Sequence, residues 1–321
     1  MTLILTRSDV LALLRVDDVI AAVEQAHLDL ALGRAALPAP AAATLGEATF
    51  VAMTAASEPA GLAAVKLLAD LPGNRQRSTV MAVDAGTGAC AALIDGAAVT
   101  RFRTAAATAV ATRALARPDA HVLGLVGAGP LAEAHAHALS VVHPFTTVVL
   151  WGRTREKALD LAKRLTEDLG VPVTLADGPR EVTLAADVLC TLTPSKEPLV
   201  KGDWFLPGLH VNAVGAPPRT DHREVDTHGV ARARVVVDSH ATTMQKSGEA
   251  ALAIAEGAVT ADHFRLELGD VLAGREAGRQ SPEQITLFNS VGVGLQDLAT
   301  ARLLIDEAGR RGLGTEVDLA A

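Results

Sequence analysis

The sequence predicts an α/β protein with a doubly wound parallel sheet and a second, split α+β domain. The chain has 321 residues, which is long enough for two domains. After Pro118, short apolar runs alternate with helix-like segments, as in a parallel sheet covered by helices on both faces. Before Pro118, apolar runs follow one another with only turns between them, which is typical of a mixed or antiparallel sheet.

The first part of the chain is predicted to contain two helices and several strands. Apolar residues recur at every third or fourth position in Asp17–Leu32, which is the spacing of an amphipathic helix. We expect a loop at Ala35–Thr44, because Pro38 and Pro40 interrupt it, and an Ala-rich helix at Arg103–Leu115. The predicted strands are Thr49–Ala52, Ala63–Leu68, Thr79–Asp84 and Ala89–Ile94.

The second part is predicted to alternate between strands and helices. The strands are His121–Val126, Thr146–Trp151, Val171–Leu175, Asp187–Leu192, His210–Val214 and Arg234–Asp238, and the helices are Leu131–Val141 and Thr154–Leu169. A last helix, Gly294–Arg311, is expected to return to the first domain. The predicted domains are therefore residues 1–117 plus 294–321, and residues 118–293.

Composition argues against several classes of partner. The net charge is −8 and aromatic residues make up 2%, whereas nucleic-acid-binding surfaces carry basic patches and stacking rings. No apolar run reaches the roughly 18 residues of a membrane span, and no signal peptide is visible. We expect a cytoplasmic protein without nucleic-acid or membrane partners. We also expect free thiols at Cys90 and Cys190 and no metal site.

A glycine-rich turn lies between a predicted strand and a predicted helix. Its pattern is G-x-G-x-x-A, from Gly127 to Ala132. The first glycine permits a tight turn, the second leaves room for a pyrophosphate, and the helix N-terminus offers free N–H groups to phosphates. A plain strand–helix turn would look similar, but this position favours a dinucleotide site. The expected contacts are Gly127, Ala128, Gly129, Pro130 and Leu131.

The residues after the next strand indicate which dinucleotide binds. An acidic residue here would bind the ribose 2′-hydroxyl of NAD, but the sequence has Arg153, Thr154 and Arg155. A guanidinium group can pair with a 2′-phosphate. We therefore expect NADP(H), with NAD(H) as the alternative, although a solvated helix start would carry the same arginines.

Several segments, in this order and spacing, resemble the ornithine cyclodeaminase/mu-crystallin family. They are Gly61–Leu68, Asp84–Thr112, the glycine turn, Ala186–Leu199, Gly208–Gly215 and Ile285–Ala299. The resemblance implies a Rossmann domain at 118–293 and a split domain at 1–117 plus 294–321 that binds substrate and dimerises. It places the active site in the cleft between them. Family activities include cyclisation of ornithine to proline, alanine dehydrogenation and reduction of cyclic ketimines such as piperideine- or pyrroline-2-carboxylate.

The resemblance assigns two catalytic residues, Lys66 and Arg103. Lys66 would bind the substrate carboxylate or polarise the imine nitrogen, and a lysine in an apolar run is costly to bury unless it is paired. Arg103 would hold the substrate carboxylate or the cofactor phosphates, and Thr104 would add a hydroxyl to a phosphate. The structural alternatives are a solvent-facing lysine, a surface ion pair of Arg103 and a helix N-cap at Thr104.

Further cofactor contacts are expected at the carboxyl ends of the parallel strands or just beyond, where cofactors bind. These residues are Thr191, Leu192, Thr193, Val214, Gly215, Ser290 and Gly292. Turn formation would explain the threonines and the serine equally well.

The sequence departs from the family pattern at two places. Relatives carry an arginine that grips a carboxylate where this chain has Pro40, so the substrate differs or Arg75 or Arg77 substitutes. The aspartate of the cyclodeaminases is missing after Gly215, and Asp221 is displaced from that position. The second departure favours reduction over cyclodeamination.

We therefore predict an NAD(P)H-dependent reductase of a small imine or cyclic ketimine, acting as a homodimer. One alternative is an amino-acid cyclodeaminase or an alanine-dehydrogenase-like enzyme that acts on a keto or amino acid. The other is a non-catalytic NADP-binding protein of the crystallin kind.

Overall fold

The computed structural model describes residues 1–73 and 75–319. The chain divides into two compact units. The first unit comprises Met1–Ala107 and the chain from Gly292 on, and the second comprises Thr108–Val291. We expected the boundaries between the two units after residues 117 and 293. The first boundary instead lies after Ala107, inside helix α3 (Gly96–Leu115), and the second lies after Val291.

The first unit is built on a mixed sheet of eight described strands in the order β15-β1-β7-β6-β5-β4-β2, with β3 paired to β4. Its centre is an antiparallel meander of β4 to β7, as the sequence predicted, and among the described pairings of this sheet only β1–β7 is parallel. The strands are β1 (Thr2–Leu5), β2 (Ala35–Ala36), β3 (Ala41–Leu45), β4 (Ala48–Ser57), β5 (Leu62–Leu71), β6 (Arg75–Asp84), β7 (Cys90–Asp95) and β15 (Thr315–Val317).

The loop predicted at Ala35–Thr44 is wrong, since this segment contains β2 and most of β3. Both strands pair antiparallel with β4. Pro38 and Pro40 lie in the short link between the two strands, where a missing backbone N–H costs no ladder hydrogen bond. The prolines therefore interrupt an edge without abolishing it.

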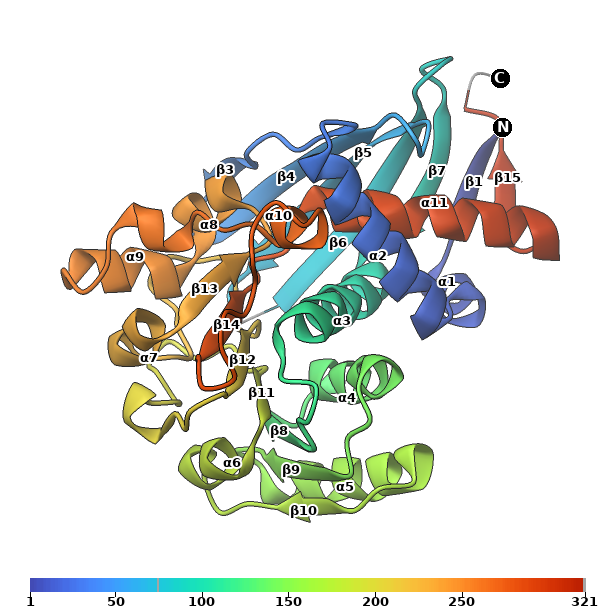
Figure 1. Cartoon of the computed structure of the whole chain (residues 1–321). Coiled ribbons are helices and arrows are strands. Elements are labelled where there is room, and N and C mark those ends of the chain that lie inside the picture. Colours follow the sequence, from blue (N-terminus) through green and yellow to red (C-terminus); the bar gives the residue numbers. More distant parts are fainter. Residues whose placement is uncertain (74, 320–321) are drawn as a thin grey trace. The chain divides into compact units, whose positions relative to one another are not determined.

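Helices of the first unit cover one face of this sheet. They are α1 (Arg7–Leu13), α2 (Val16–Ala31), the first part of α3 and α11 (Gly294–Arg311). Helix α11 lies on β4, β5 and β6 and against α2 (Figure 1). Leu298 and Leu304 on α11 join Val80 and Ile94 of the sheet in one buried cluster. The predicted helices at 17–32 and 294–311 are confirmed.

The second unit contains a seven-stranded sheet, described from β8 to β14, in which every pairing is parallel. The order is β10-β9-β8-β11-β12-β14-β13, so the direction of strand addition reverses between β8 and β11. The strands are β8 (Val122–Val126), β9 (Thr147–Trp151), β10 (Val173–Leu175), β11 (Val188–Thr191), β12 (His210–Ala213), β13 (Arg234–Val237) and β14 (Thr286–Asn289). This arrangement confirms the predicted doubly wound Rossmann sheet.

The helices of the second unit lie between successive strands. Figure 1 shows α4 and α5 beside β8, β9 and β10, in agreement with their contacts. The helices are α4 (Pro130–Val142), α5 (Arg155–Leu169), α6 (Pro179–Ala185), α7 (Thr227–Arg232), α8 (His240–Lys246), α9 (Gly248–Ala255) and α10 (Leu268–Leu272), with 3₁₀ turns at Gly202–Trp204 and Ala261–Phe264.

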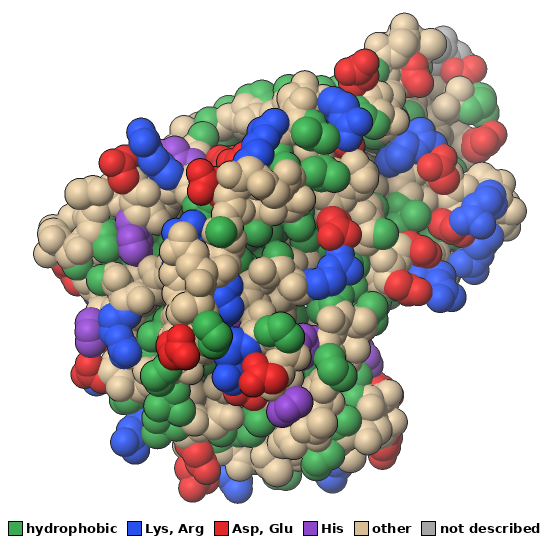
Figure 2. Space-filling view, viewed as in Figure 1, with side chains coloured by type: hydrophobic (Ala, Val, Ile, Leu, Met, Phe, Trp, Pro, Cys, Tyr) green, Lys and Arg blue, Asp and Glu red, His purple; other side chains and the backbone are tan. Residues whose placement is uncertain are grey.

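The surface carries both signs of charge. On the face shown in Figure 2, Lys and Arg side chains are interspersed with Asp and Glu, which differs from the basic stripe of a nucleic-acid-binding surface. Among the helices that the structure describes, none has the length and apolar character of a membrane span.

Candidate functional site

The first unit contains a buried ion cluster centred on Asp297. Lys66 on β5 donates to both carboxylate oxygens of Asp297, with Nζ–Oδ1 and Nζ–Oδ2 distances of 3.2 and 3.3 Å. Arg103 on α3 donates through Nε to Oδ1 of the same carboxylate at 3.2 Å. Lys66, Arg103 and Asp297 are only 2%, 4% and 1% exposed. Three elements that are distant in sequence therefore meet at one carboxylate.

The ion cluster carries a net positive charge. Among the residues that the structure describes, Lys66 and Arg103 both pair with the single carboxylate of Asp297. Burial lowers the pKa of the Lys66 ammonium to about 8, although the charge of Asp297 opposes this effect and that of Arg103 adds to it. A buried cation without full compensation is costly, so the cluster favours an additional anion.

A second layer of polar side chains orients Arg103. Its Nη1 donates to Oε1 of Gln296 at 2.9 Å, and Nε2 of Gln296 lies 3.1 Å from Nε2 of His27. Burial lowers the pKa of His27 to about 4, so this imidazole is neutral near pH 7 and Nε2 can accept from the Gln296 amide. Arg103 is therefore held by a carboxylate on one side and by an amide on the other.

Two predicted cofactor contacts, Gly292 and Thr104, lie beside Arg103 in the first unit. At Gly292, φ is +73° and an added Cβ would lie 2.3 Å from Nη1 of Arg103, so a side chain here would displace the guanidinium group. Thr104 is buried within α3. Because α3 begins at Gly96 rather than at Arg103, Thr104 is not a helix N-cap and Arg103 lies inside the helix.

Asp297 was missed by sequence reasoning, although the sequence carried a signal. Asp297, Ala301, Leu304 and Ala308 follow one another at helical spacing and are all buried. The aspartate therefore occupies the apolar stripe of an amphipathic helix. A charge in such a stripe needs an oppositely charged partner in the core. Lys66 and Arg103 are the partners of Asp297.

In the second unit, the glycine turn has the geometry that its sequence predicted. Gly127 has φ of +125°, and an added Cβ would lie 2.8 Å from the carbonyl oxygen of Leu192. Gly129 is the N-cap of α4 with no capping side chain, and Pro130 follows at the first helical turn. No capping side chain covers this helix N-terminus, although Pro130 has no N–H and the N–H of Ala132 already donates to the backbone oxygen of Gly129 at 2.9 Å. An uncovered helix N-terminus favours a phosphate group.

The glycine turn forms one wall of a pocket of about 310 Å³. The lining residues are Gly127, Ala128, Gly129, Trp151, Gly152, Arg153, Thr154, Lys157, Leu192, Thr193, Pro194, Ser195 and Leu199. The structure thus brings seven predicted cofactor contacts together, namely Gly127, Ala128, Gly129, Arg153, Thr154, Leu192 and Thr193. Lys157 and Ser195 were not predicted.

Two of the predicted arginines at this site differ in their surroundings. Arg153 is exposed and lines the pocket. Arg155 is not among the lining residues, and its Nη1 lies 3.5 Å from a carboxylate oxygen of Asp177, with both side chains exposed. Lys157, one turn further along α5, joins Arg153 in the lining. The cationic wall of the pocket is therefore Arg153 and Lys157.

Other predicted contacts at the carboxyl ends of the strands lie in a buried polar network. Thr191 donates to the backbone oxygen of Asn212 at 3.5 Å, and Ser290 donates to Asp238 at 3.0 Å. Val214 is buried, and the N–H group of Gly215 donates to Glu224. Leu131 lies in the first turn of α4, after Pro130.

Glu224 is a further residue that sequence reasoning missed. It is fully buried, and burial raises the pKa of its carboxyl to about 7, while hydrogen bonds from Thr193 lower it and the charge of Glu249 raises it further. The segment around Glu224 has no helical or strand period, so nothing in the sequence marked it as buried. Only the meeting of two loops in the fold places it in the interior.

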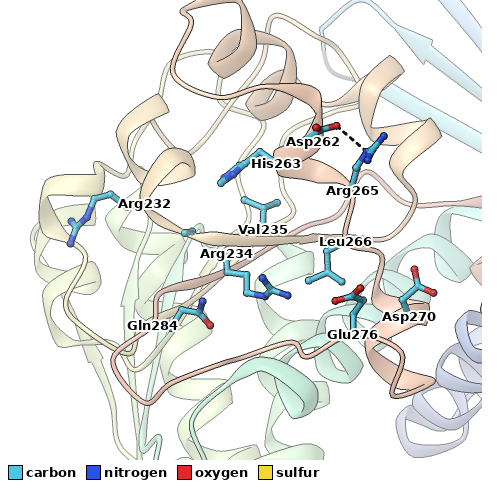
Figure 3. A pocket seen from close by; sticks show the side chains of 11 residues that line it. Arg232, Arg234, Val235, Asp262, His263, Arg265, Leu266, Asp270, Glu276 and Gln284 are labelled. Carbon is cyan, nitrogen blue, oxygen red and sulfur yellow. Dashed lines mark ion pairs between the residues drawn. The ribbon is translucent and has the colours of Figure 1, made fainter.

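A larger pocket of about 580 Å³ lies elsewhere in the second unit, where β13 begins (Figure 3). Its arginines are already engaged: Arg234 donates to the backbone oxygens of Ala277 and Gly278, and Arg265 pairs with Asp262. Cofactors of open parallel sheets bind at the carboxyl ends of strands, whereas this pocket lies at an amino end. The glycine turn, at the carboxyl end of β8, is therefore the candidate cofactor site.

Comparison with known proteins agrees with this geometry. The model of the ornithine cyclodeaminase/mu-crystallin family matches residues 1–312. The chain belongs to this family. Delta(1)-pyrroline-2-carboxylate reductase of Bacillus cereus is 34% identical over 277 residues, which cover 84% of this chain and 85% of that protein.

Solved structures of family members extend the similarity to the whole chain. The Delta(1)-pyrroline-2-carboxylate reductase of Thermococcus litoralis, in complex with NADH and L-proline, matches with a TM-score of 0.93 and 32% identity, covering 98% of this chain and 100% of that one. An archaeal alanine dehydrogenase dimer with bound NAD matches with a TM-score of 0.94 and 30% identity, covering 99% of each chain.

The ion cluster leads to a stability prediction. Asp297→Asn keeps the shape of the side chain but leaves Lys66 and Arg103 without a buried counter-charge. Removing one partner of a buried ion pair typically costs about 3–5 kcal/mol, and we expect a loss of this size in the free energy of unfolding measured by urea denaturation. Asp306→Asn on the exposed face of the same helix, which breaks a pair with Arg302, should cost less than about 1 kcal/mol. Equal losses in both variants would contradict the prediction.

Proposed function

We propose that this protein is an NAD(P)H-dependent reductase that transfers a hydride to the C=N bond of a small imine or cyclic ketimine bearing a carboxylate. The observation that carries the proposal is the buried cluster in which Lys66 and Arg103 share the single carboxylate of Asp297. A substrate carboxylate would supply the missing negative charge. We further propose that the first unit provides the substrate-binding side chains and the second unit provides the cofactor site.

The proposal accounts for the substitution at Pro40. This residue lies in the link between β2 and β3, so the arginine that relatives carry here has no equivalent at this position. Lys66 and Arg103 remain as two buried cations, and a guanidinium group can bind a carboxylate through two parallel hydrogen bonds. We therefore propose that these two side chains suffice for an anionic substrate of small size.

The residues around the glycine turn fit a nicotinamide dinucleotide. An added Cβ at Gly129 would meet no atom within 4 Å, so there is space beside the backbone here, and the N-terminus of α4 would offer its N–H groups to a pyrophosphate. The cofactor, when bound, supplies the hydride. The chain itself orients the substrate through its cations, and such positioning contributes much of the rate in enzymes that use a cofactor for the chemistry.

We propose that Lys66 also delivers the proton that accompanies reduction. Burial holds the pKa of its ammonium at about 8, close to the working range in which a general acid is most effective. Asp297 keeps the ammonium group in place through both of its oxygens. Lys66 can therefore hydrogen-bond to the substrate in its charged form and release a proton at moderate cost.

We propose NADP(H) as the preferred cofactor. The wall formed by Arg153 and Lys157 offers two positive charges to a 2′-phosphate, and among the described residues neither is engaged in an ion pair. The two solved relatives described above contain NADH and NAD. The proposed preference for the 2′-phosphate therefore rests on Arg153 and Lys157 of this chain.

A homodimer is the assembly that we propose. The support is the archaeal alanine dehydrogenase, which is a dimer and resembles this chain along its whole length.

Cyclodeamination is disfavoured, because the residue that replaces the expected aspartate is not acidic and Asp221 is half exposed and paired with Lys196 and His222.

The first experiment measures reduction of a small panel of imines. The panel contains piperideine-2-carboxylate, pyrroline-2-carboxylate, a cyclic imine without a carboxylate, and pyruvate with ammonia, each with NADPH and with NADH. We expect turnover of the carboxylated rings and a much lower kcat/KM for the ring without a carboxylate. Reduction of only the carboxylate-free imine would contradict the role of the ion cluster. No reduction of any imine would contradict the proposed function.

The pH dependence tests the proton donor. Because Lys66 is charged below a pKa of about 8, kcat/KM for imine reduction should fall as pH rises through that value, and the reverse oxidation should rise. The Lys66→Arg variant keeps a positive charge throughout this range, so its residual activity should not show the decrease. The same decrease in the wild type and in Lys66→Arg would assign the titration to another group or to the substrate.

Cofactor choice depends on the pocket wall. Arg153→Gln removes a charge-assisted contact worth about 1.5–3 kcal/mol, so KM for NADPH should rise about tenfold or more, while KM for NADH stays nearly constant. Arg164→Gln on α5, the helix that follows Arg153, is the control, because this arginine pairs with Glu133; it should change neither constant. Equal KM values for NADPH in Arg153→Gln and the wild type would contradict the proposed preference.

A further inference from the structure

The carboxylate of Glu224 joins two separate loops of the second unit. Its Oε1 accepts hydrogen bonds from the backbone N–H and the hydroxyl of Thr193, at 2.6 and 2.7 Å. Its Oε2 accepts from the backbone N–H groups of Gly215 and Ala216, at 2.7 and 3.2 Å. Thr193 follows β11 and Gly215 follows β12, so a single side chain connects the ends of two neighbouring strands.

These loops are packed as closely as their backbones allow. A Cβ added to Gly215 would lie 2.1 Å from the backbone nitrogen of Thr193, so only glycine permits the approach. Thr193 in turn lines the pocket that contains the glycine turn, and the carbonyl oxygen of Leu192 faces Gly127. The position of the pocket wall therefore depends on the bonds that Glu224 makes behind it.

The position in the sheet indicates which part of a dinucleotide these loops serve. The strand order reverses between β8 and β11, and a dinucleotide lies across such a reversal with one nucleotide on each side. The glycine turn and Arg153 follow β8 and β9, on the adenosine side. Thr193 and Gly215 follow β11 and β12, across the reversal and toward the nicotinamide side, and Thr193 also lines the pocket that contains the glycine turn and Arg153.

We propose that Glu224 is a positioning residue, whose carboxylate holds the Thr193 and Gly215 loops in the arrangement that binds the nicotinamide half of the cofactor. This inference rests on the proposed function, because it needs a nicotinamide dinucleotide at the glycine turn. Glu224 itself acts through the two loops and reaches no reacting atom.

Only a carboxylate satisfies this arrangement. Each oxygen of Glu224 accepts from two donors, so a glutamine in either orientation would direct its NH₂ group at a pair of N–H or O–H donors. The neighbouring Glu249 differs, because its Oε1 accepts from the N–H of Glu224 at 2.9 Å and its Oε2 lies 3.5 Å from the hydroxyl oxygen of Ser247, which can accept as well as donate a hydrogen bond. An amide oxygen can accept the bond from Glu224 equally well, so Glu249→Gln is a matched control at a similarly buried glutamate.

The experiment compares binding of the whole cofactor with binding of its adenosine half. Affinities for NADPH and for 2′,5′-ADP are measured by fluorescence and calorimetry on wild type, Glu224→Gln and Glu249→Gln. For Glu224→Gln we expect the Kd for NADPH to rise at least tenfold and the Kd for 2′,5′-ADP to stay within about twofold. Glu249→Gln should leave both values within about twofold. If the wild type prefers NADH, the same comparison is made with NADH and ADP.

The outcomes separate positioning from a general loss of structure. A rise of both Kd values by the same factor in Glu224→Gln would show that the residue only stabilises the unit, and unchanged values would show that the bonds are dispensable; either result overturns the inference. A wild type that binds neither dinucleotide would overturn the proposed function, and with it this inference.

A milder pair of variants tests the same bonds if Glu224→Gln does not fold. Thr193→Val removes the hydroxyl donor to Glu224, whereas Thr193→Ser keeps it. The first should weaken NADPH binding about threefold or more, and by a larger factor than it weakens 2′,5′-ADP binding, and the second should restore the wild-type value. Equal affinities for NADPH in Thr193→Val and Thr193→Ser would overturn the inference.

Discussion

The buried carboxylate of Asp297 is the interaction on which the arrangement of the first unit depends. It lies on α11, which follows the whole second unit in sequence, and it binds Lys66 and Arg103, which precede that unit. The two cations could not stay buried without it, because burying a charge that lacks a partner is among the most expensive steps in folding. The return of the chain to the first unit thus completes both the packing and the charge balance.

The two units use buried carboxylates in different ways. Asp297 binds cations and leaves the cluster positive, so the site attracts an anion. Glu224 accepts four hydrogen bonds from uncharged donors, so it connects the backbones of two loops and pairs with no cation through these bonds. The first arrangement suits recognition of a small acid, and the second suits a fixed loop pair beside a cofactor. Both cost desolvation energy that only a well-satisfied geometry offsets.

Much of the fold could be predicted from the sequence, for identifiable reasons. Strands such as β8 and β11 are buried on both faces and appear as continuous apolar runs, and the long helices α2, α5 and α11 show a clear period. Short helices such as α8 and α10 have too few turns to show one. The strand β14, Thr286–Asn289, has polar residues at both ends, and its burial follows from its place between β12 and β13.

The site was predictable where local geometry determines it and unpredictable where distant segments meet. The glycine turn and Arg153 lie within one strand–helix–strand segment, so their spacing alone predicts a common pocket. Glu224 is different, because its role exists only when the ends of β11 and β12 are adjacent. That adjacency is a property of parallel pairing, which joins strands separated by a crossover. Carboxylates at such positions have no local sequence pattern, so their contacts follow only from the topology of the sheet.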